Sequence, residues 1–336
     1  MRWLTDSWYH PSPLRWLLSP LSALYRFITG IRRWAYQRGL LQRYRPPVPV
    51  IVVGNISVGG TGKTPVVIWL AEQLRQAGYQ PGIISRGYGG NAPYYPFEVT
   101  AATSPTHAGD EPVLIARRSL CPVVVDAKRS QAAMHLLNQY QCNVIISDDG
   151  LQHYALQRDV EIILVDAKRR FGNQYCLPAG PLREPLSRLK QVDFIIFNGH
   201  TKQADDNIKY APAHYSMQLT PSHWINLADP RRTLPLTAFQ GQQAHAVAAI
   251  GHPQRFFDSL SPLGITVHPH AFTDHHAFQA EDIQFNDKLP ILMTEKDAVK
   301  CQHFAQDTMW YLPVSASLTG TLMPAILQRL KRSSHG

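Results

Sequence analysis

The sequence predicts an α/β fold, in which a mostly parallel sheet is covered by helices on both faces and a smaller α/β domain follows. After Pro46-Pro47, short β-branched runs alternate with helical stretches, which is the pattern of βαβ units. The same alternation resumes after a polar stretch nearer the C-terminus. The length of 336 residues suits two domains, and a hydrophobic content of 44% excludes a disordered chain.

A basic, tryptophan-rich segment precedes the first expected strand. Residues 1–50 carry eight Arg and one acidic residue, Asp6, so most of the net charge of +9 lies there and a nucleic-acid coat over the whole surface is disfavoured. The longest uncharged stretch, residues 16–25, is about half of the roughly 20 residues that span a bilayer. No small-residue cleavage site follows it, so we expect neither a transmembrane helix nor a signal peptide.

Ser19-Pro20 predicts the start of a helix, because serine caps a helix and proline suits its first turn. Apolar residues then recur at helical spacing, with Arg26 and Arg33 on the opposite face. Such a helix suits the headgroup boundary of an anionic membrane. The alternative is a helix that packs on the protein's own core and leaves its arginines in solvent. The apolar face comprises Leu21, Leu24, Tyr25, Ile28, Ile31 and Ala35.

The remaining elements follow in chain order. In the larger domain, over residues 46–210, we expect strands at 48–54, 82–85, 122–126, 143–147, 161–165 and 194–198, and helices at 64–78, 111–118 and 130–139. Residues 211–241 lie in a stretch rich in Asp, Asn, Pro and Thr and are expected to form a linker. The smaller domain, over 242–330, is expected to hold strands at 244–250, 265–268, 291–294 and 310–313 and a helix at 253–263.

A glycine-rich loop between a strand and a helix is the strongest local motif. It reads GNISVGGTGKTP from Gly54, and this strand–loop–helix context is the one a P-loop requires. Its backbone N–H groups and the helix N-terminus attract phosphate oxygens. Lys63 would reach the β- and γ-phosphates, and the Thr64 hydroxyl would bind Mg²⁺. Ser57 stands where the usual pattern begins with glycine. The residues of the loop that we expect to bind the nucleotide are Gly59, Gly60, Thr61, Gly62, Lys63 and Thr64.

Two adjacent carboxylates end another expected strand. Asp148 and Asp149 follow an apolar run, where P-loop proteins place the acid that orients Mg²⁺ or its water. Together with the P-loop they indicate Mg²⁺-nucleotide chemistry. No guanine-reading NKxD motif follows in the later strand FIIFNGHT, which favours ATP.

Several further loops lie where strands end and could line a ligand crevice. These are SRGYG from Ser85, GDEP from Gly109, and residues 166–185, whose Arg169, Arg170 and Arg183 suit an anionic acceptor. In the smaller domain, FTDHH has a histidine beside a carboxylate, which suits a base or proton carrier. Each of these loops has the plainer interpretation of a solvated turn.

Eight motifs in order resemble one family, the tetraacyldisaccharide 4′-kinases that phosphorylate lipid A precursors in Gram-negative bacteria. The resemblance runs from the N-terminal helix to about residue 315. It implies two α/β/α sandwich domains with the active site between them, the first of P-loop kinase type. It also implies transfer of the ATP γ-phosphate to the 4′-hydroxyl of tetraacyldisaccharide 1-phosphate, giving lipid IVA. The motifs are GGTGKTP, SRGYG, GDEP, DDGLQH, FGNxxxLPAGPLREP, IGxPxRFF, FTDHH and LMTEKDAVK.

The resemblance also implies roles for individual residues. Asp110 of GDEP and His275 of FTDHH match the family's catalytic dyad, with Asp110 as general base and His275 orienting it, although the two roles remain interchangeable. Thr64, Asp148 and Asp149 match the metal site. Ser57 is ordinary for this family. Nucleotide or substrate contacts are implied for Tyr88, Arg129, Arg183 and Glu184, and Gln152 and His153 lie just beyond the acidic pair.

The expected ligands are ATP, Mg²⁺ and the lipid acceptor, and nucleic acid is not expected. The resemblance places the protein peripherally at the cytoplasmic face of the inner membrane, held by its N-terminal helix. Four scattered cysteines with no CxxC pair exclude an evident zinc finger and fit a reducing compartment. Two alternatives remain, a membrane-tethered P-loop switch ATPase and a non-enzymatic nucleic-acid or lipid binder, and the second leaves the P-loop and acidic pair unexplained.

Overall fold

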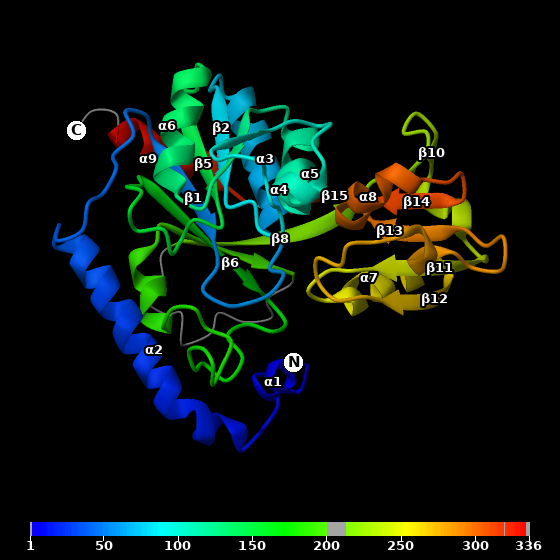
Figure 1. Cartoon of the computed structure of the whole chain (residues 1–336), viewed down its shortest axis with the longest axis horizontal. Coiled ribbons are helices and arrows are strands. Elements are labelled where there is room, and N and C mark those ends of the chain that lie inside the picture. The colour runs from blue at the N-terminus through cyan, green and yellow to red at the C-terminus, as the bar shows by residue number, and fades with distance from the viewer. Residues whose placement is uncertain (1, 200–212, 319, 334–336) are drawn as a thin grey trace.

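The protein forms two α/β domains that lie side by side, with a long helix along the outside of the larger one (Figure 1). The computed structural model describes residues 2–199, 213–318 and 320–333. The fold class is the one that the sequence predicts.

The larger domain is built on a nine-stranded sheet in the order β15-β8-β7-β6-β1-β5-β2-β4-β3. All neighbouring strands run parallel except the two edge pairs, β3 with β4 and β15 with β8. The carboxyl ends of the central strands β1, β5 and β2 therefore lie next to one another at the same end of the sheet, where parallel sheets bind ligands. The strands are β1 Val50–Gly54, β2 Pro81–Ser85, β3 Phe97–Val99, β4 Val123–Val125, β5 Val144–Asp148, β6 Val160–Asp166, β7 Phe194–Asn198, β8 His214–Pro221 and β15 Val314–Leu318.

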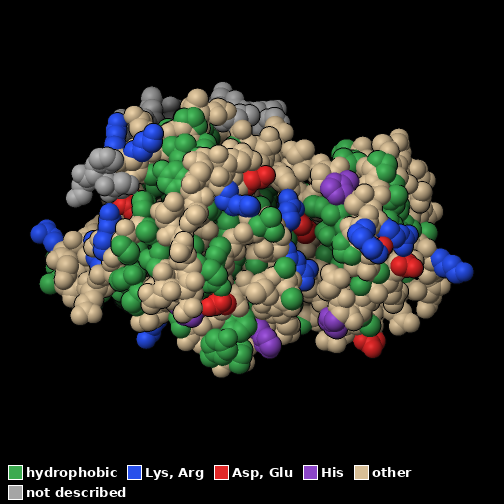
Figure 2. All heavy atoms as spheres, turned by 90° about the horizontal axis from the view of Figure 1, so that it is seen from above, with side chains coloured by type: hydrophobic (Ala, Val, Ile, Leu, Met, Phe, Trp, Pro, Cys, Tyr) green, Lys and Arg blue, Asp and Glu red, His purple; other side chains and the backbone are tan. Residues whose placement is uncertain are grey.

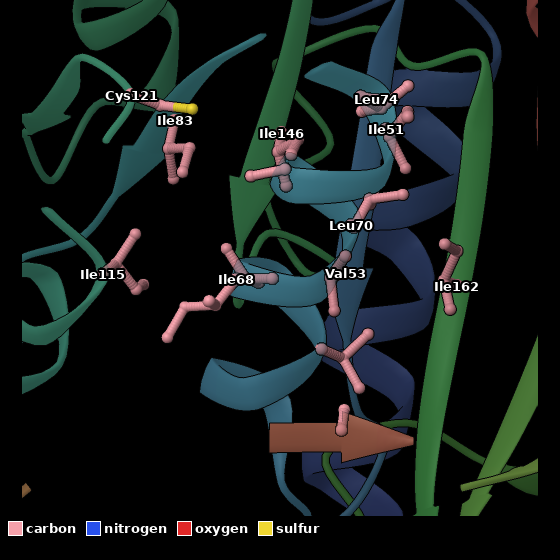
Figure 3. Close-up of a cluster of buried hydrophobic side chains, with 14 of the residues drawn as sticks. Ile51, Val53, Ile68, Leu70, Leu74, Ile83, Ile115, Cys121, Ile146 and Ile162 are labelled. Carbon is pink, nitrogen blue, oxygen red and sulfur yellow. The ribbon is translucent and has the colours of Figure 1, made fainter. Parts of the chain in front are cut away.

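Helices and loops cover both faces of this sheet. On one face, β-branched residues of the central strands pack against α3 and α5 (Figure 3) and against α9. On the other face, α6 and the segment after β5 cover the sheet. The central strands are buried on both sides, as expected of a parallel sheet. The helices are α3 Lys63–Gln76, α4 Pro105–Ala108, α5 Asp110–Ser119, α6 Arg129–Gln139 and α9 Leu322–Ser333.

The smaller domain has a six-stranded sheet in the order β10-β9-β14-β13-β11-β12. Its core joins Trp224, Phe239 and Trp310 with the aromatic face of α7. Its elements are β9 Trp224–Asn226, β10 Thr233–Leu234, β11 Gln243–Ala248, α7 Pro253–Leu260, β12 Thr266–Ala271, β13 Ile291–Thr294, α8 Glu295–Cys301 and β14 Met309–Leu312.

The expected strands and helices of residues 46–199 are present, with their ends within two residues of the prediction. The expected division into domains is wrong after that point. Residues 213–241 are not a linker, because β8 extends the larger sheet and β9 and β10 belong to the smaller one. The chain then returns to the larger domain through β15 and α9, instead of ending in the smaller domain at residue 330. The boundary expected near residue 210 lies outside the described residues.

The physical reason is that β15 is the edge strand of the sheet and that β8, beside it, is its antiparallel partner. Each of these strands has only one buried residue, Met217 in β8 and Ala316 in β15, and their other positions are at least partly exposed. Such strands lack the continuous apolar run that identifies a central strand in a sequence.

The N-terminal segment holds α1 Arg2–Ser7 and α2 Leu14–Gln37. The predicted start of the second helix at Ser19 is wrong, because Pro20 lies inside α2. A Ser-Pro pair does begin the helix, but it is the earlier Ser12-Pro13, whose serine hydroxyl accepts from the Leu14 N–H at 3.3 Å. The Ser19 hydroxyl donates to the Trp16 carbonyl at 2.9 Å, which is the carbonyl that proline at position 20 cannot reach.

The apolar face of α2 does not pack on the protein's own core. Of the predicted apolar positions, only Tyr25 turns inward to contact the core. Among the described residues, no helix is both long and apolar enough to cross a bilayer. The exposed large apolar side chains of α2 are Trp16, Leu17, Leu21, Leu24, Phe27, Ile28, Ile31 and Trp34, which we call the α2 apolar face.

Candidate active site

The glycine-rich loop closes tightly between β1 and α3. Gly62 has a φ of 90° and immediately precedes α3, and a Cβ there would lie 2.7 Å from Asn198 Nδ2 and 2.7 Å from Met217 Cε. Asn198 Nδ2 also donates to the Thr61 carbonyl at 3.1 Å. Strand β7 and the following strand, through Asn198 and Met217, therefore hold the loop from behind.

A second loop, residues 167–185, braces the first. The Val58 N–H donates to the Pro181 carbonyl at 2.8 Å, and the Arg183 N–H donates to the Ile56 carbonyl at 2.6 Å. Ser57 pairs with Leu182 in the same bridge. The serine that replaces the usual glycine is therefore part of a backbone pairing between the two loops.

The two acidic residues at the end of β5 lie in different environments. Asp148 is fully buried, and its Oδ2 accepts from the Ser85 hydroxyl at 2.9 Å. Burial, with the charges of Glu111 and Asp149, raises the pKa of Asp148 to about 7. Asp149, at a φ of 45°, lies 3.6 Å from Lys63 Nζ and 3.0 Å from Arg183 Nη1. Burial opposes ionisation of Asp149, but Lys63 and then Arg183 outweigh it and lower its pKa.

This acidic pair fits a hard divalent cation. Among the described residues, no group donates a hydrogen bond to Asp148 Oδ1, although that oxygen is buried. A buried carboxylate oxygen without a donor is costly unless a cation binds it. Mg²⁺ prefers oxygen ligands such as carboxylates and hydroxyls. The hydroxyl of the P-loop belongs to Thr64, the second residue of α3.

Asp110 and His275, which are 165 residues apart in the sequence, are in contact. His275 Nδ1 lies 3.1 Å from both carboxylate oxygens of Asp110, across the boundary between the domains. Asp110 begins α5 and is only 4% exposed. Gly109 precedes it at a φ of 87°, where a Cβ would lie 2.4 Å from the Tyr88 carbonyl, so glycine is required there. His275 itself has a φ of 60°.

The hydrogen bond to Asp110 raises the pKa of His275. For Asp110, burial alone would raise the pKa. The hydrogen bond from His275 and the nearby charge of Lys296 outweigh burial, so the pKa of Asp110 is lowered. The pair therefore favours an ionised carboxylate facing a protonated imidazole.

Two lysines that the sequence pattern did not single out lie beside Asp110. Lys296 Nζ and Lys300 Nζ, both on α8, lie 3.8 and 3.9 Å from Asp110 Oδ2. Lys296 also contacts Glu111 at 2.9 Å and Asp274 at 3.5 Å. Figure 2 shows acidic and basic side chains gathered where the two domains meet. The signal was present in the LMTEKDAVK motif, but alternating charges on a short helix are equally typical of a solvated surface.

The smaller domain also reaches the glycine-rich loop. A Cβ on Gly251, which follows β11, would lie 3.3 Å from the Gly60 nitrogen. Arg255 of α7 contacts Asp166, at the end of β6, at 2.8 Å. The glycine-rich loop and the Asp110–His275 pair therefore both lie along the boundary between the two domains.

A cavity of about 630 Å³ opens beside the dyad. Tyr88 is 65% exposed, and its ring packs edge-on against His275 with the ring centroids 5.0 Å apart. The volume is within the usual range for a small-molecule site. The lining residues are Arg86, Gly87, Tyr88, Gly89, Gly90, Tyr95, Pro96, Asp126, Ala127, Lys128 and Gln131.

Arg183 and Glu184, predicted as ligand contacts, already have protein partners. Arg183 holds Asp149, as described above. Glu184 is buried, and its two oxygens accept from Gln152 Nε2 at 2.7 Å and from the Tyr154 hydroxyl. It also lies 3.3 Å from Arg188 Nε. The structure therefore places Glu184 within a network that supports the loop.

Two further residues singled out by the sequence are Arg129, at the start of α6, and His153 of the DDGLQH motif. Arg129 is buried beside Asp148 and Asp149, and its Nη1 donates to the Asp126 carbonyl at 2.7 Å. His153 has a pKa lowered to about 3, first by burial and then by Arg129 and Arg86. His153 is therefore neutral at physiological pH.

The long helix α2 is fixed to the loop that carries Arg183. The Ser22 hydroxyl donates to the Cys176 carbonyl at 2.7 Å, and the Tyr25 hydroxyl donates to the Arg183 carbonyl at 3.1 Å. The α2 apolar face is thus held at a set distance from the acidic pair.

Comparisons with known proteins identify the family of the chain. A model of the family described as tetraacyldisaccharide-1-P 4′-kinase matches residues 14–331. The tetraacyldisaccharide 4′-kinases of Nitrosococcus oceani and Aeromonas salmonicida are each 51% identical to the chain, over 97% of its length and 94% and 96% of theirs. A crystal structure of LpxK from Aquifex aeolicus in complex with ATP is 29% identical, has a TM-score of 0.77, and covers 94% of this chain and 99% of that one.

Proposed function

Because the chain belongs to the tetraacyldisaccharide-1-P 4′-kinase family, we propose that it transfers the γ-phosphate of ATP to the 4′-hydroxyl of tetraacyldisaccharide 1-phosphate, forming lipid IVA. It is an ATP-dependent kinase of lipid A biosynthesis. One observation carries the assignment of the site. The P-loop lysine, two carboxylates and the Asp110–His275 pair meet along one domain boundary, as phosphoryl transfer requires.

In the reaction, the 4′-oxygen attacks the γ-phosphorus, and the bond from that phosphorus to the β–γ bridging oxygen breaks. ADP leaves with the bonding electrons, and the hydroxyl proton passes to the Asp110 carboxylate. A sugar hydroxyl has a high pKa and the pKa of Asp110 is lowered, so the proton moves only as the O–P bond forms. His275 orients the carboxylate, and Lys63 neutralises charge on the transferred group.

Mg²⁺ would be held by Thr64, Asp148 and Asp149. When bound, it would neutralise charge on the phosphate oxygens. Oδ1 of Asp148, which is buried and has no hydrogen-bond donor within the described part of the chain, supports this assignment. Lys63 lies beside the same acidic pair, with its Nζ 3.6 Å from Asp149.

The acceptor headgroup is proposed to occupy the cavity beside Tyr88. This cavity begins at the ring that packs on His275, so a sugar in it would reach Asp110. Arg86 and Lys128 supply positive charge on its wall, which suits the 1-phosphate of the acceptor, and Asp126 faces the cavity as well. We propose that Tyr88 contacts the substrate, that Arg183 positions Asp149, and that Glu184 acts through its loop.

The α2 apolar face is proposed to dock on the anionic surface of the inner membrane. Its exposed Trp, Phe and Leu side chains, with arginines along the same helix, have the composition of an interfacial helix. A groove of about 540 Å³ on this face, lined by Ala23, Arg26, Phe27, Gly30, Ile31 and Trp34, suits an acyl chain of the acceptor.

The test is phosphate transfer from γ-labelled ATP to the acceptor in detergent micelles, with the phosphorylated position mapped. We expect label at the 4′-position with the wild type, and a loss of at least about two orders of magnitude in Lys63→Ala. Asp307→Asn, an exposed aspartate of the smaller domain, is the matched control and should retain activity. Steady release of phosphate with no labelled lipid would instead support a tethered switch ATPase.

A further inference from the structure

Helix α8 presents two lysines to the same carboxylate oxygen. Lys296 and Lys300 are four residues apart and therefore lie on one face of the helix. Their Nζ atoms approach Asp110 Oδ2 at 3.8 and 3.9 Å, and both side chains are largely buried. No role for these two residues follows from the phosphate-binding motif or from the Asp110–His275 pair.

Each lysine is fixed by other carboxylates. Lys300 Nζ lies 2.7 Å from Asp297 and 4.9 Å from the centre of the Phe278 ring. Lys296 Nζ lies 2.9 Å from Glu111 and 3.5 Å from Asp274. These closer contacts hold the ammonium groups in place, so that they act on Asp110 as positioned charges and not as mobile surface lysines.

The groups around Asp110 come from two different domains. Asp110 and Glu111 begin α5 in the larger domain, and the Glu111 N–H donates to Asp110 Oδ1 at 2.8 Å. The cationic groups, His275, Lys296 and Lys300, all belong to the smaller domain. Burial alone would favour the protonated acid, so the ionised state of Asp110 depends on charges delivered from across the boundary.

We propose that Lys296 and Lys300 are positioning residues for phosphoryl transfer, which hold Asp110 ionised so that it can accept the hydroxyl proton only when the smaller domain is seated against it. This inference rests on the proposed function. The general base is then complete only when the two domains are in contact, because Asp110 belongs to the larger domain and His275, Lys296 and Lys300 belong to the smaller one.

A purely structural role is the rival explanation, and the chain offers a matched control for it. Glu295 is the neighbour of Lys296 on α8, and it contacts Arg118 of the larger domain at 2.8 Å. Arg118 lies near the far end of α5 from Asp110. Glu295→Gln therefore weakens the same domain boundary without removing a charge that faces Asp110.

The lysine variants are chosen to remain folded. Lys300→Met alone would leave Asp297 buried and uncompensated, so it is combined with Asp297→Asn, which keeps an oxygen for the Thr294 hydroxyl and the Ala249 N–H. Lys296→Met is the second variant, because its partners Glu111 and Asp274 reach solvent. Lys300→Arg retains the charge. Melting temperature and ATP affinity are measured for each.

The experiment measures kcat for lipid phosphorylation from about pH 5.5 to 9 as a ratio to the wild type. Loss of a cation within 4 Å raises the pKa of a carboxylate by about 1 to 3 units. We expect the variants Lys300→Met/Asp297→Asn and Lys296→Met to lose about threefold or more at pH 5.5, where a carboxyl whose pKa is raised by about two units is mostly protonated, and to recover as pH rises, with ATP affinity little changed. Lys300→Arg should follow the wild-type profile, and Glu295→Gln should give a ratio independent of pH.

Two results would count against this inference. If the lysine variants lose the same fraction of activity at every pH, as Glu295→Gln is expected to, the lysines serve only to hold the domains together and the inference is overturned. If the wild type transfers no phosphate to the lipid, the proposed function fails and this inference fails with it.

Discussion

Replacing Leu24 and Ile28 by serine removes the centre of the α2 apolar face without touching the core. The two residues lie one turn apart, and they are 54% and 56% exposed. Burying a whole side chain of this kind is worth about 1.5–3 kcal/mol, and slightly more than half of each is available to a membrane. The pair should therefore contribute about 2–3 kcal/mol to membrane binding, or roughly 30- to 150-fold in partitioning.

The assay is cosedimentation of the full chain with vesicles of phosphatidylethanolamine and phosphatidylglycerol at fixed salt. The control is Leu120→Asn, because Leu120 is 74% exposed on the larger domain, away from α2, at a φ of 55° that asparagine tolerates. We expect the double variant to lose binding and the control to keep it, with the stability of both within about 0.5 kcal/mol of the wild type. Unchanged vesicle binding by the folded double variant would refute the role assigned to this face.

Two further predictions concern the site itself. Gly62→Ala places a Cβ 2.7 Å from Asn198 Nδ2 at a positive φ, so ATP affinity measured by calorimetry should fall at least about tenfold, and an unchanged affinity would show that the loop relaxes. Burial raises the pKa of Asp148 to about 7. The folded protein therefore keeps a proton that the unfolded chain releases at about pH 4, so the free energy of unfolding falls as pH rises from about 4 to 7. Asp148→Asn should therefore stabilise the nucleotide-free protein at pH 8 by at least about 1 kcal/mol while abolishing transfer, and a melting temperature below that of the wild type would contradict this.

The phosphate-binding loop and the acidic pair could be predicted because their determinants are local. A strand, a glycine-rich turn and a helix follow one another within residues 50–76, and Asp148 and Asp149 end a fully buried strand. The start of α2 was predicted wrongly for an equally local reason. Two Ser-Pro pairs compete, and only the structure shows that the Ser19 hydroxyl compensates for Pro20 within the helix.

Contacts between distant segments could not be derived from spacing alone. The pairing of Asp110 with His275 was expected only because the motifs resemble a family, and Lys296 was missed even though its motif was recognised. The return of the chain through β15 was missed because an exposed edge strand has little hydrophobic pattern. Glu184 illustrates the converse, since a charged residue in a polar loop proved to be buried among protein partners.

The central claim is that Asp110 accepts a proton during phosphoryl transfer in the boundary between the domains. The most direct measurement is single-turnover transfer by Asp110→Asn, an isosteric change, with ATP affinity measured on the same sample. We predict transfer at least about a hundredfold slower than the wild type, with ATP affinity within about threefold. Transfer at the wild-type rate with intact ATP binding would contradict the account, because proton acceptance would then occur elsewhere.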